Sequence, residues 1–324
     1  MSSPAREYDI VVLGASGYTA SIGAEYIAKN SRTDLKWAIA GRSRGKLEAL
    51  AEKLKAINPD RIQPDIVSFL VAKTIHDRHR GVGAGEVNST AKLEIQGMSD
   101  GSLNTVLSLI QTYGIGWILF GNPWSLSATS QRRKPNPTPH LSRIFSYRSI
   151  PGFGDVTTSF LAICNESIAH RSSTLMPKIY GPDFNFHEYL PTTGPFAGVV
   201  THLILRLVML IISFPPVQWL TAKYLIPASG TGPDLATAAD SERQEFLAIG
   251  APLKSKGAQV SARYVYEGSL YYCSALMGVE AALSILGEKT YAHEIAGGIL
   301  TPATLRLPFI ERLRSAGLKI EVDA

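Results

Sequence analysis

Near the N-terminus, an apolar run ends abruptly at a glycine, and a helical pattern begins a few residues later. The segment is DIVVLGASGYTASIGAEYIAKN, residues 9–30, and its first residues have the length and composition of a buried strand. A second apolar segment, LKWAIA at 35–40, and a helical segment, RGKLEALAEKLKAI at 44–57, follow. This alternation of strand and helix predicts the α/β class, with a parallel sheet flanked by helices.

The glycines of the first turn are spaced as they are where a main chain approaches a diphosphate. Gly14 permits a tight turn after the strand, and Gly17 leaves room for the diphosphate because it has no Cβ. Ala20 takes the third position, where close packing of helix on strand tolerates alanine. The helix that follows offers free N–H groups and the positive end of its dipole to phosphates. The pattern predicts a dinucleotide-binding turn, and an ordinary strand-to-helix corner is the alternative.

The end of the second strand carries cationic and hydroxyl groups where the adenosine ribose lies in such folds. The residues there are AGRSRGK, 40–46. An Asp or Glu would bind a ribose 2′-hydroxyl, whereas Arg42, Ser43 and Lys46 suit a 2′-phosphate. These residues favour NADPH over NADH as the cofactor, and a solvated helix N-terminus is the alternative.

The two segments together resemble the start of the saccharopine dehydrogenase-like oxidoreductases, including the group described as trans-acting enoyl reductases. The resemblance returns in GDVTTSFLAICNESIAHRS (154–172), YGPDFNFHEY (180–189) and GGILTPATLRLPFIERLRSAGLKIEV (297–322). The family implies a Rossmann domain that binds a nicotinamide cofactor, and an associated second domain. By this resemblance the phosphate turn comprises Gly14, Ser16, Gly17, Tyr18 and Thr19, and the ribose-side element comprises Arg42 and Ser43.

The middle of the chain departs from the family pattern, and the chain is shorter than the family norm. Family members continue with a strand that ends in a GPY-like segment beside the nicotinamide. Here TVLSLIQTYGIGWILFGNP, 105–123, begins in that style and then loses it, and residues 113–150 look foreign to the family. A deletion, altered splicing or a reading-frame error would each account for this. Cofactor binding can survive such a change while hydride transfer is lost.

The predicted organisation has three parts. A Rossmann-type domain occupies 1–123, with a pattern that loosens after residue 64, a loop or linker occupies 124–153, and a second α+β domain occupies 154–324. Within these parts we expect a strand at 65–71, a glycine-rich turn at 80–86, a helix near 101–112, a helix capped by Asp155, strands at 244–250 and 257–268, and a helix at 269–287.

Composition and single motifs exclude several classes of function. The chain has 32 Lys and Arg against 27 Asp and Glu, a net charge of +5 without a basic stripe, so we expect no nucleic-acid partner. Its two cysteines and the absence of a secretory apolar region at the N-terminus predict a reducing, cytoplasmic location. His76 and His79 have metal-ligand spacing, but Arg78 and Arg80 would repel a cation, so no metal site is predicted.

A further segment, GVVTHLILRLVMLIISF at 198–214, is apolar around almost its whole circumference. Such a helix is either buried or in contact with lipid. It is shorter than the roughly 20 residues of a spanning helix, and Pro215 and Pro216 end it. One interpretation is a helix covered by the second domain or by a partner. The other is a shallow hairpin in one leaflet, which would place the protein at a membrane or lipid-droplet surface.

The sequence therefore supports two hypotheses of function. The first is an NADPH-dependent oxidoreductase that reduces an enoyl or carbonyl group of a lipid-like or polyketide-like substrate. The second is a catalytically inactive, membrane-peripheral interaction protein that retains the cofactor fold. Tyr271 and Tyr272 are candidates for proton donation, but aromatic residues at a helix start more often pack, so no catalytic residue is assigned. Monomer and homo-oligomer both remain open.

Overall fold

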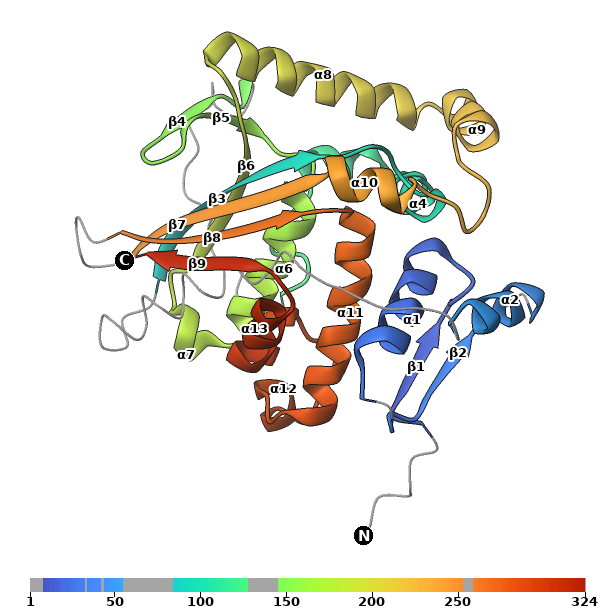
Figure 1. Ribbon diagram of the computed structural model, residues 1–324. Helices are drawn as coiled ribbons and strands as arrows, with labels where there is room; N and C mark the ends of the chain where they lie inside the picture. The colour runs from blue at the N-terminus through green and yellow to red at the C-terminus, as the bar shows by residue number, and fades with distance from the viewer. Residues whose placement is uncertain are drawn as a thin grey trace.

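The strands of this chain form two separate sheets. The computed structural model describes residues 8–32, 34–41, 44–54, 84–127, 145–252 and 259–323. Within these ranges, one sheet has two strands and the other has seven. Figure 1 shows the small sheet with its two helices beside helix α11, and the large sheet crossing the rest of the molecule.

The small unit confirms the predicted alternation at the N-terminus. Its elements are β1 (Ile10–Leu13), α1 (Tyr18–Asn30), β2 (Trp37–Ala40) and α2 (Arg44–Leu54). The two strands are parallel and in register from Ile10 opposite Trp37 to Leu13 opposite Ala40, so their carboxyl ends meet at one edge. Ala15, Ala24 and Leu50 form a small core between strands and helices. The strand expected at 65–71 lies outside the described residues.

The large sheet has the order β4-β5-β6-β3-β7-β8-β9. Its strands are β3 (Ala84–Glu94), β4 (Arg148–Ile150), β5 (Gly154–Thr158), β6 (Asn185–Pro191), β7 (Arg243–Pro252), β8 (Val260–Glu267) and β9 (Lys319–Asp323). Strand β3 pairs with β6 in parallel, and the remaining neighbours in this sheet are antiparallel. This mixed sheet is the α+β part of the molecule.

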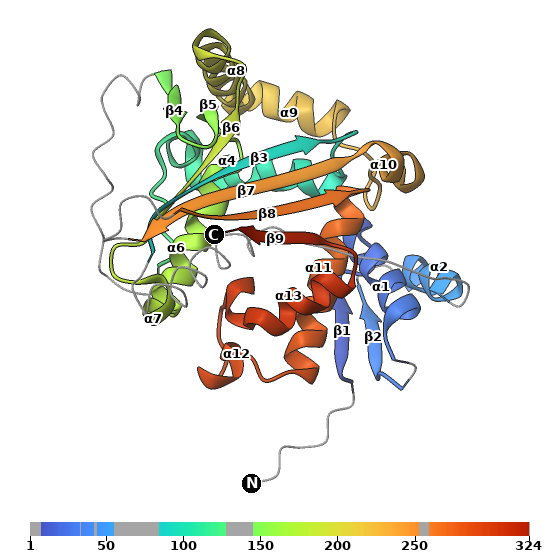
Figure 2. The same cartoon turned by 60° about the vertical axis from the view of Figure 1, so that its left-hand side comes forward.

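Helices cover both sides of the large sheet. They are α4 (Asp100–Phe120), α6 (Ala162–Leu175), α7 (Pro177–Tyr180), α8 (Pro195–Ser213), α9 (Pro215–Tyr224), α10 (Leu235–Ser241), α11 (Leu270–Gly287), α12 (Tyr291–Glu294) and α13 (Arg306–Ser315), with a 3₁₀ turn at Pro302–Leu305. Helices α8 and α9 lie on one side, and α11, α12 and α13 lie on the other (Figures 1 and 2). The main core includes buried residues of β3, β7, β8, α11 and α13.

Two predictions in the middle of the chain are wrong. Residues 84–86, expected in a glycine-rich turn of the first domain, begin β3, which lies in the centre of the large sheet between β6 and β7. Asp155 does not cap a helix, because residues 154–158 form β5 and α6 begins only at Ala162. The β-branched run Val156, Thr157 and Thr158 favours a strand, and the Asp155 carboxylate instead accepts a hydrogen bond from the Tyr147 hydroxyl at 2.7 Å.

The boundaries between the three expected parts also differ in the structure. Although β3 and α4 fall within 1–123, β3 pairs in the large sheet and α4 packs on α8. Strand β4 lies inside the expected loop at 124–153, whereas residues 128–144 of that loop lie outside the described residues. The strands β7 and β8, the helix α11 and the helix break at Pro215 agree with the sequence patterns.

Helix α1 is held against α11 by close packing and a buried polar contact. A Cβ at Gly23 would lie 3.6 Å from the Ala275 carbonyl oxygen, so the two backbones approach closely here. The Tyr26 hydroxyl donates to Glu280 Oε1 at 2.7 Å, and Arg312 Nε donates to Glu280 Oε2 at 2.7 Å. Glu280 is 1% exposed. These contacts fix the glycine turn of the small unit relative to the large sheet.

Candidate functional site

The turn between β1 and α1 has the compact form that a diphosphate requires. Gly14 has a φ of +76°, a left-handed conformation that favours glycine. The Gly17 N–H donates to the Gly14 carbonyl oxygen at 2.8 Å, and a Cβ at Gly17 would lie only 3.2 Å from that oxygen. The N-cap of α1 is Gly17, which has no side chain that could cap the helix. An uncapped helix start behind a glycine cradle fits a bound phosphate group.

The predicted site residues around this turn lie at the edge where β1 and β2 end. The Ser16 Oγ atom lies 3.1 Å from the position that a Cβ of Gly41 would take, just beyond β2. Thr19, in the first turn of α1, lines a cavity described below. The remaining two predicted residues, Arg42 and Ser43, lie outside the described residues.

A segment far along the chain from this turn lies against it. We call residues 228–234, between α9 and α10, the strap. A Cβ at Gly230 would lie 2.9 Å from the Ser16 carbonyl oxygen, and the Lys46 ammonium donates to the Ser229 carbonyl at 2.8 Å. Asp100, at the start of α4, anchors the strap because its carboxylate accepts the Gly230 N–H at 3.1 Å. The strap thus lies beside two groups that the sequence assigns to phosphate binding.

Tyr18 contacts the strap rather than the inside of the turn. Its hydroxyl donates to the Pro233 carbonyl oxygen, and its ring fills the space that a Cβ of Gly232 would need. Burial, with a smaller contribution from Glu242, raises the pKa of Tyr18 to about 12. The phenol is therefore neutral at physiological pH. Tyr18 contributes its main-chain N–H to the start of α1, whereas its side chain contacts the strap.

An apolar cavity of about 510 Å³ extends from the turn towards α8. Thr19 lies at its border on α1, and Met209 of α8 is also part of its wall. Its apolar lining comes mainly from α4 and the start of α6, and comprises Met98, Val106, Leu109, Phe160, Leu161, Ile163 and Met209. A volume and composition of this kind are typical of small-molecule sites.

A smaller cavity of about 240 Å³ adjoins the first. The two share Phe160, Ile163 and Met209 as lining residues. The polar lining of the smaller cavity comprises Thr158, Ser159, Glu166 on α6 and Arg206 on α8. Burial lowers the pKa of Arg206 from its ordinary value. The combined space therefore has a long apolar part and a short polar part.

Hydroxyl groups form a chain in the wall of the larger cavity. The Ser102 and Tyr271 hydroxyl oxygens lie 2.8 Å apart, and the Tyr271 oxygen also accepts the Ser99 N–H at 2.6 Å. Ser99 caps α4, because its Oγ accepts the Ser102 N–H. The Tyr271 ring packs edge-on against Tyr18, with a centroid distance of 5.3 Å. Tyr272, the other tyrosine considered from the sequence, packs against Tyr26 instead.

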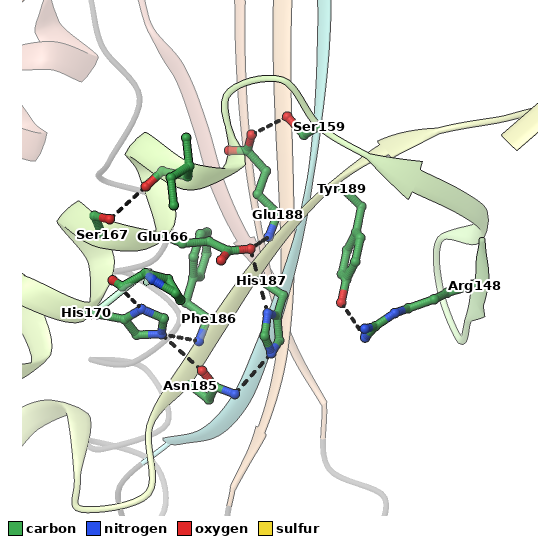
Figure 3. A network of polar contacts seen from close by, with 12 residues as sticks. Arg148, Ser159, Glu166, Ser167, His170, Asn185, Phe186, His187, Glu188 and Tyr189 are labelled. Atoms are coloured by element: carbon green, nitrogen blue, oxygen red, sulfur yellow. Dashed lines mark hydrogen bonds and ion pairs between the residues drawn. The ribbon is translucent and has the colours of Figure 1, made fainter. Parts of the chain in front are cut away.

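A second polar network fixes the α6 wall of the cavities to the large sheet (Figure 3). Glu188 of β6 is buried and accepts hydrogen bonds from Ser159 and Asn165, both at 2.6 Å. Burial raises the pKa of Glu188. The Glu166 carboxylate accepts the Glu188 N–H at 3.1 Å and lies 3.7 Å from His187.

These residues come from the two segments, 154–172 and 180–189, that carry the family resemblance, but no role was predicted for them. The segment NFHEYLP, which forms β6, alternates apolar and polar residues. It carried no signal for the partners of its polar face, because those partners lie on α6 and on the turn before it.

Similarities to known proteins agree with the family resemblance that the sequence motifs indicate. No family model matches the chain. A Mycobacterium tuberculosis protein named as a trans-acting enoyl reductase is 22% identical over an alignment of 420 residues that covers 99% of both chains. A mouse saccharopine dehydrogenase-like oxidoreductase is 40% identical over 58 residues, which is 16% of this chain and 14% of the mouse protein. These two similarities confirm the resemblance to saccharopine dehydrogenase-like oxidoreductases.

The alignment with the mycobacterial protein is longer than the 324 residues of this chain, so that protein has segments that this chain lacks. This agrees with the expectation that the chain is shorter than the family norm. Among solved structures, saccharopine dehydrogenase (L-Glu forming) from Saccharomyces cerevisiae is similar over 97% of this chain and 100% of its own, with 13% identity and a TM-score of 0.46.

Proposed function

We propose that the protein is an NADPH-dependent oxidoreductase that reduces an enoyl or carbonyl group of a lipid-like or polyketide-like substrate. The observation that carries this proposal is the apolar cavity that starts at Thr19, on the helix that follows the glycine turn. A reductase needs its cofactor site and its substrate site to adjoin, because hydride passes directly between two carbons held in contact. The resemblance to enoyl reductases supports the same reaction class.

The glycine turn supplies the cofactor site in this proposal. Gly14 and Gly17 leave room for the diphosphate, and the uncapped N–H groups of α1 stabilise its charge. Arg42 and Ser43, together with Lys46, are the candidates for the 2′-phosphate that distinguishes NADPH from NADH. When bound, the nicotinamide supplies the hydride, and the protein places it beside the substrate.

The cavities supply the substrate site. The larger one has a largely apolar lining, which suits an acyl or polyketide chain, and the smaller one has Glu166 and Arg206 in its wall, where a polar end of the substrate would lie. Water exclusion strengthens the electrostatic interactions made around the reacting carbon. The polar network of Figure 3 keeps the α6 wall of this site in place.

Isothermal titration calorimetry of the purified full chain with NADPH and with NADH tests the cofactor assignment. We expect binding of NADPH that is tighter than binding of NADH. Gly17→Val should weaken NADPH binding at least tenfold, because its side chain enters the cradle. Gly278→Val on α11, where a Cβ meets no atom within 4 Å, is the matched control and should bind as wild type does. If neither NADPH nor NADH binds, the proposal is refuted.

A second candidate function follows from the exposed surface of α8 and α9. Helix α8 has a mean hydropathy of 2.1 over its most apolar window, yet only 17% of that window is buried. Leu207 is 55% exposed and Ile211 is 49% exposed, and residues 190–233 contain no Asp or Glu. An unburied apolar helix in a stretch of sequence without Asp or Glu suits an interfacial position on a lipid surface. The protein would then be a catalytically inactive, membrane-peripheral protein of the cytoplasm.

By length and composition, two described helices could cross a membrane, α8 and α11. Helix α11 has a core position, with Cys273 and Leu276 buried, so α8 is the one that faces outward. Flotation with liposomes tests the second candidate: Leu207→Glu combined with Ile211→Glu should abolish flotation. The control Ile285→Glu, on an exposed site of α11, should leave it intact. NADPH turnover with any enoyl thioester excludes the inactive form of this candidate.

A further inference from the structure

We propose that Ser102 and Tyr271 deliver the proton that accompanies hydride transfer, an inference that rests on the proposed reductase function. Reduction of an enoyl or carbonyl group adds a hydride and a proton, so the protein must present an acidic O–H, N–H or S–H group to the substrate. The hydroxyl chain in the wall of the larger cavity provides such a group at the border with the cofactor turn.

The hydrogen bonds of Tyr271 are compatible with a chain that runs from its hydroxyl to Ser102. Its hydroxyl oxygen accepts the Ser99 N–H at 2.6 Å, which leaves its own O–H to donate. The Ser102 Oγ atom, 2.8 Å away, is an acceptor for that O–H. With one lone pair occupied by Tyr271, the Ser102 O–H can turn either to Ser99 Oγ at 3.2 Å or into the cavity that Ser102 lines. Ser102 would therefore touch the substrate, and Tyr271 would act through it.

Other groups in the same wall are less suited to this role. Thr105 donates its hydroxyl to the Gly101 carbonyl within α4. Burial raises the pKa of the Cys164 thiol, which makes it a weaker proton donor. Ser102 also lies in the first turn of α4, behind the cap Ser99, where the positive end of the helix dipole stabilises an alkoxide that forms in passing.

The proposed step balances with NADPH as the reductant. A hydride from the nicotinamide forms a new C–H bond at one end of the double bond, and the electron pair of that double bond moves to the other end. The Ser102 O–H bond breaks as its proton goes to the carbon or oxygen that receives the pair. The Ser102 oxygen takes the Tyr271 proton, and the Ser99 N–H stabilises the phenolate until solvent returns a proton. The net change consumes NADPH and one proton.

Without a catalytic role, the same residues would serve only to pack the helices and to cap α4, and the test must separate these two roles. The test therefore uses Tyr271→Phe and Ser102→Ala in the full chain, with Ser102→Thr as the hydroxyl-restoring variant. We expect kcat for an enoyl thioester to fall at least tenfold in the first two variants with KM little changed, and Ser102→Thr to recover most of it. The dependence of kcat on pH should also change in Tyr271→Phe. Tyr113→Phe, an exposed tyrosine on α4, is the control.

A second measurement does not depend on turnover. With 3-fluorotyrosine placed at position 271, a saturated acyl thioester added to the cofactor-free protein should shift the fluorine resonance, and should shift it far less in Ser102→Ala. Full kcat in both variants, or a resonance that the thioester does not move, overturns the proposal. If NADPH fails to bind the wild type, the cofactor assignment fails instead, and the fluorine experiment still decides whether this pair faces the ligand.

Discussion

A buried histidine makes the stability of this protein depend on pH. His170 on α6 is 0% exposed and stacks on Trp124 with a centroid distance of 3.9 Å. Its Nε2 atom accepts the Phe186 N–H at 3.1 Å, so the proton of the neutral ring is on Nδ1, which donates to the Pro123 carbonyl at 3.1 Å. A proton on Nε2 would face the Phe186 N–H, and the Asn185 Oδ1 atom, 3.0 Å from Nε2, is the group that would accept it. Burial accordingly lowers the pKa of His170 to about 4, against the opposing effects of the Pro123 carbonyl and Glu166.

The sign of the effect follows from the two states of the ring. In the unfolded chain His170 takes up a proton near its ordinary pKa of about 6.5, whereas the folded protein takes it up only near pH 4. Acid therefore favours the unfolded state, and the contribution is fully present above the unfolded pKa and is lost as pH falls towards the folded one. The difference in pKa corresponds to about 3 kcal/mol in total, and to about 2 kcal/mol between pH 7.5 and pH 5.

Urea unfolding of the wild type and of His170→Phe at these two pH values measures the effect. Phenylalanine keeps the stack on Trp124 but cannot titrate, so the variant should lose about 2 kcal/mol less than the wild type on acidification. The comparison cancels the other six histidines, since the chain has seven. Equal losses in the two proteins would show that His170 is not held neutral by the fold.

Two further predictions concern the contacts that position the glycine turn. Glu280→Ala removes the acceptor of both the Tyr26 hydroxyl and the Arg312 guanidinium, and should lower the free energy of unfolding by about 3 to 5 kcal/mol. The loss in the Glu280→Ala, Arg312→Ala double variant should be smaller than the sum of the losses in the two single variants. A loss equal to that sum would contradict the pairing. Gly232→Ala places a Cβ 2.6 Å from the Tyr18 ring, so it should cost about 1 to 3 kcal/mol and speed hydrogen exchange in the strap; unchanged exchange there would show that the strap does not rest on Tyr18.

The sequence predicted the small unit well because its determinants are local. The strand, the two glycines and the helix lie within about twenty residues, and β2 follows directly, so pattern and spacing are enough to define the parallel pair. The end of α8 was predictable for the same reason, since Pro215 cannot continue a helix with an intact hydrogen-bond ladder.

The centre of the large sheet could not be predicted in this way. Strand β3 reads AGEVNSTAKLE, and its small and polar residues gave no apolar alternation that would identify a strand. Its pairing depends on β6 and β7, which lie far along the chain, and Ser89 is buried only because both neighbours are present. Burial imposed by distant partners overrides local propensity.

The candidate site shows the same division. The turn residues Gly14, Ser16 and Gly17 are predicted by adjacent positions, whereas Ser102 and Tyr271 are 169 positions apart and meet only in the folded chain. Nothing in the spacing of either residue indicates the other. The cavity that Ser102 lines is likewise formed by residues of α4, α8 and the start of α6 together, for which no single segment carries a signal.

The strap gives the outer helices a direct connection to the nucleotide turn. It follows α9 along the chain, and its main chain at Gly230 approaches the Ser16 carbonyl. An attachment that displaced α9 would therefore pull on backbone that lies against the phosphate cradle. Thermodynamic reciprocity then requires that whatever factor such an attachment imposes on dinucleotide affinity, the dinucleotide imposes the same factor on the attachment. In such a protein, binding of the dinucleotide at the turn would change the strength of the attachment at α9.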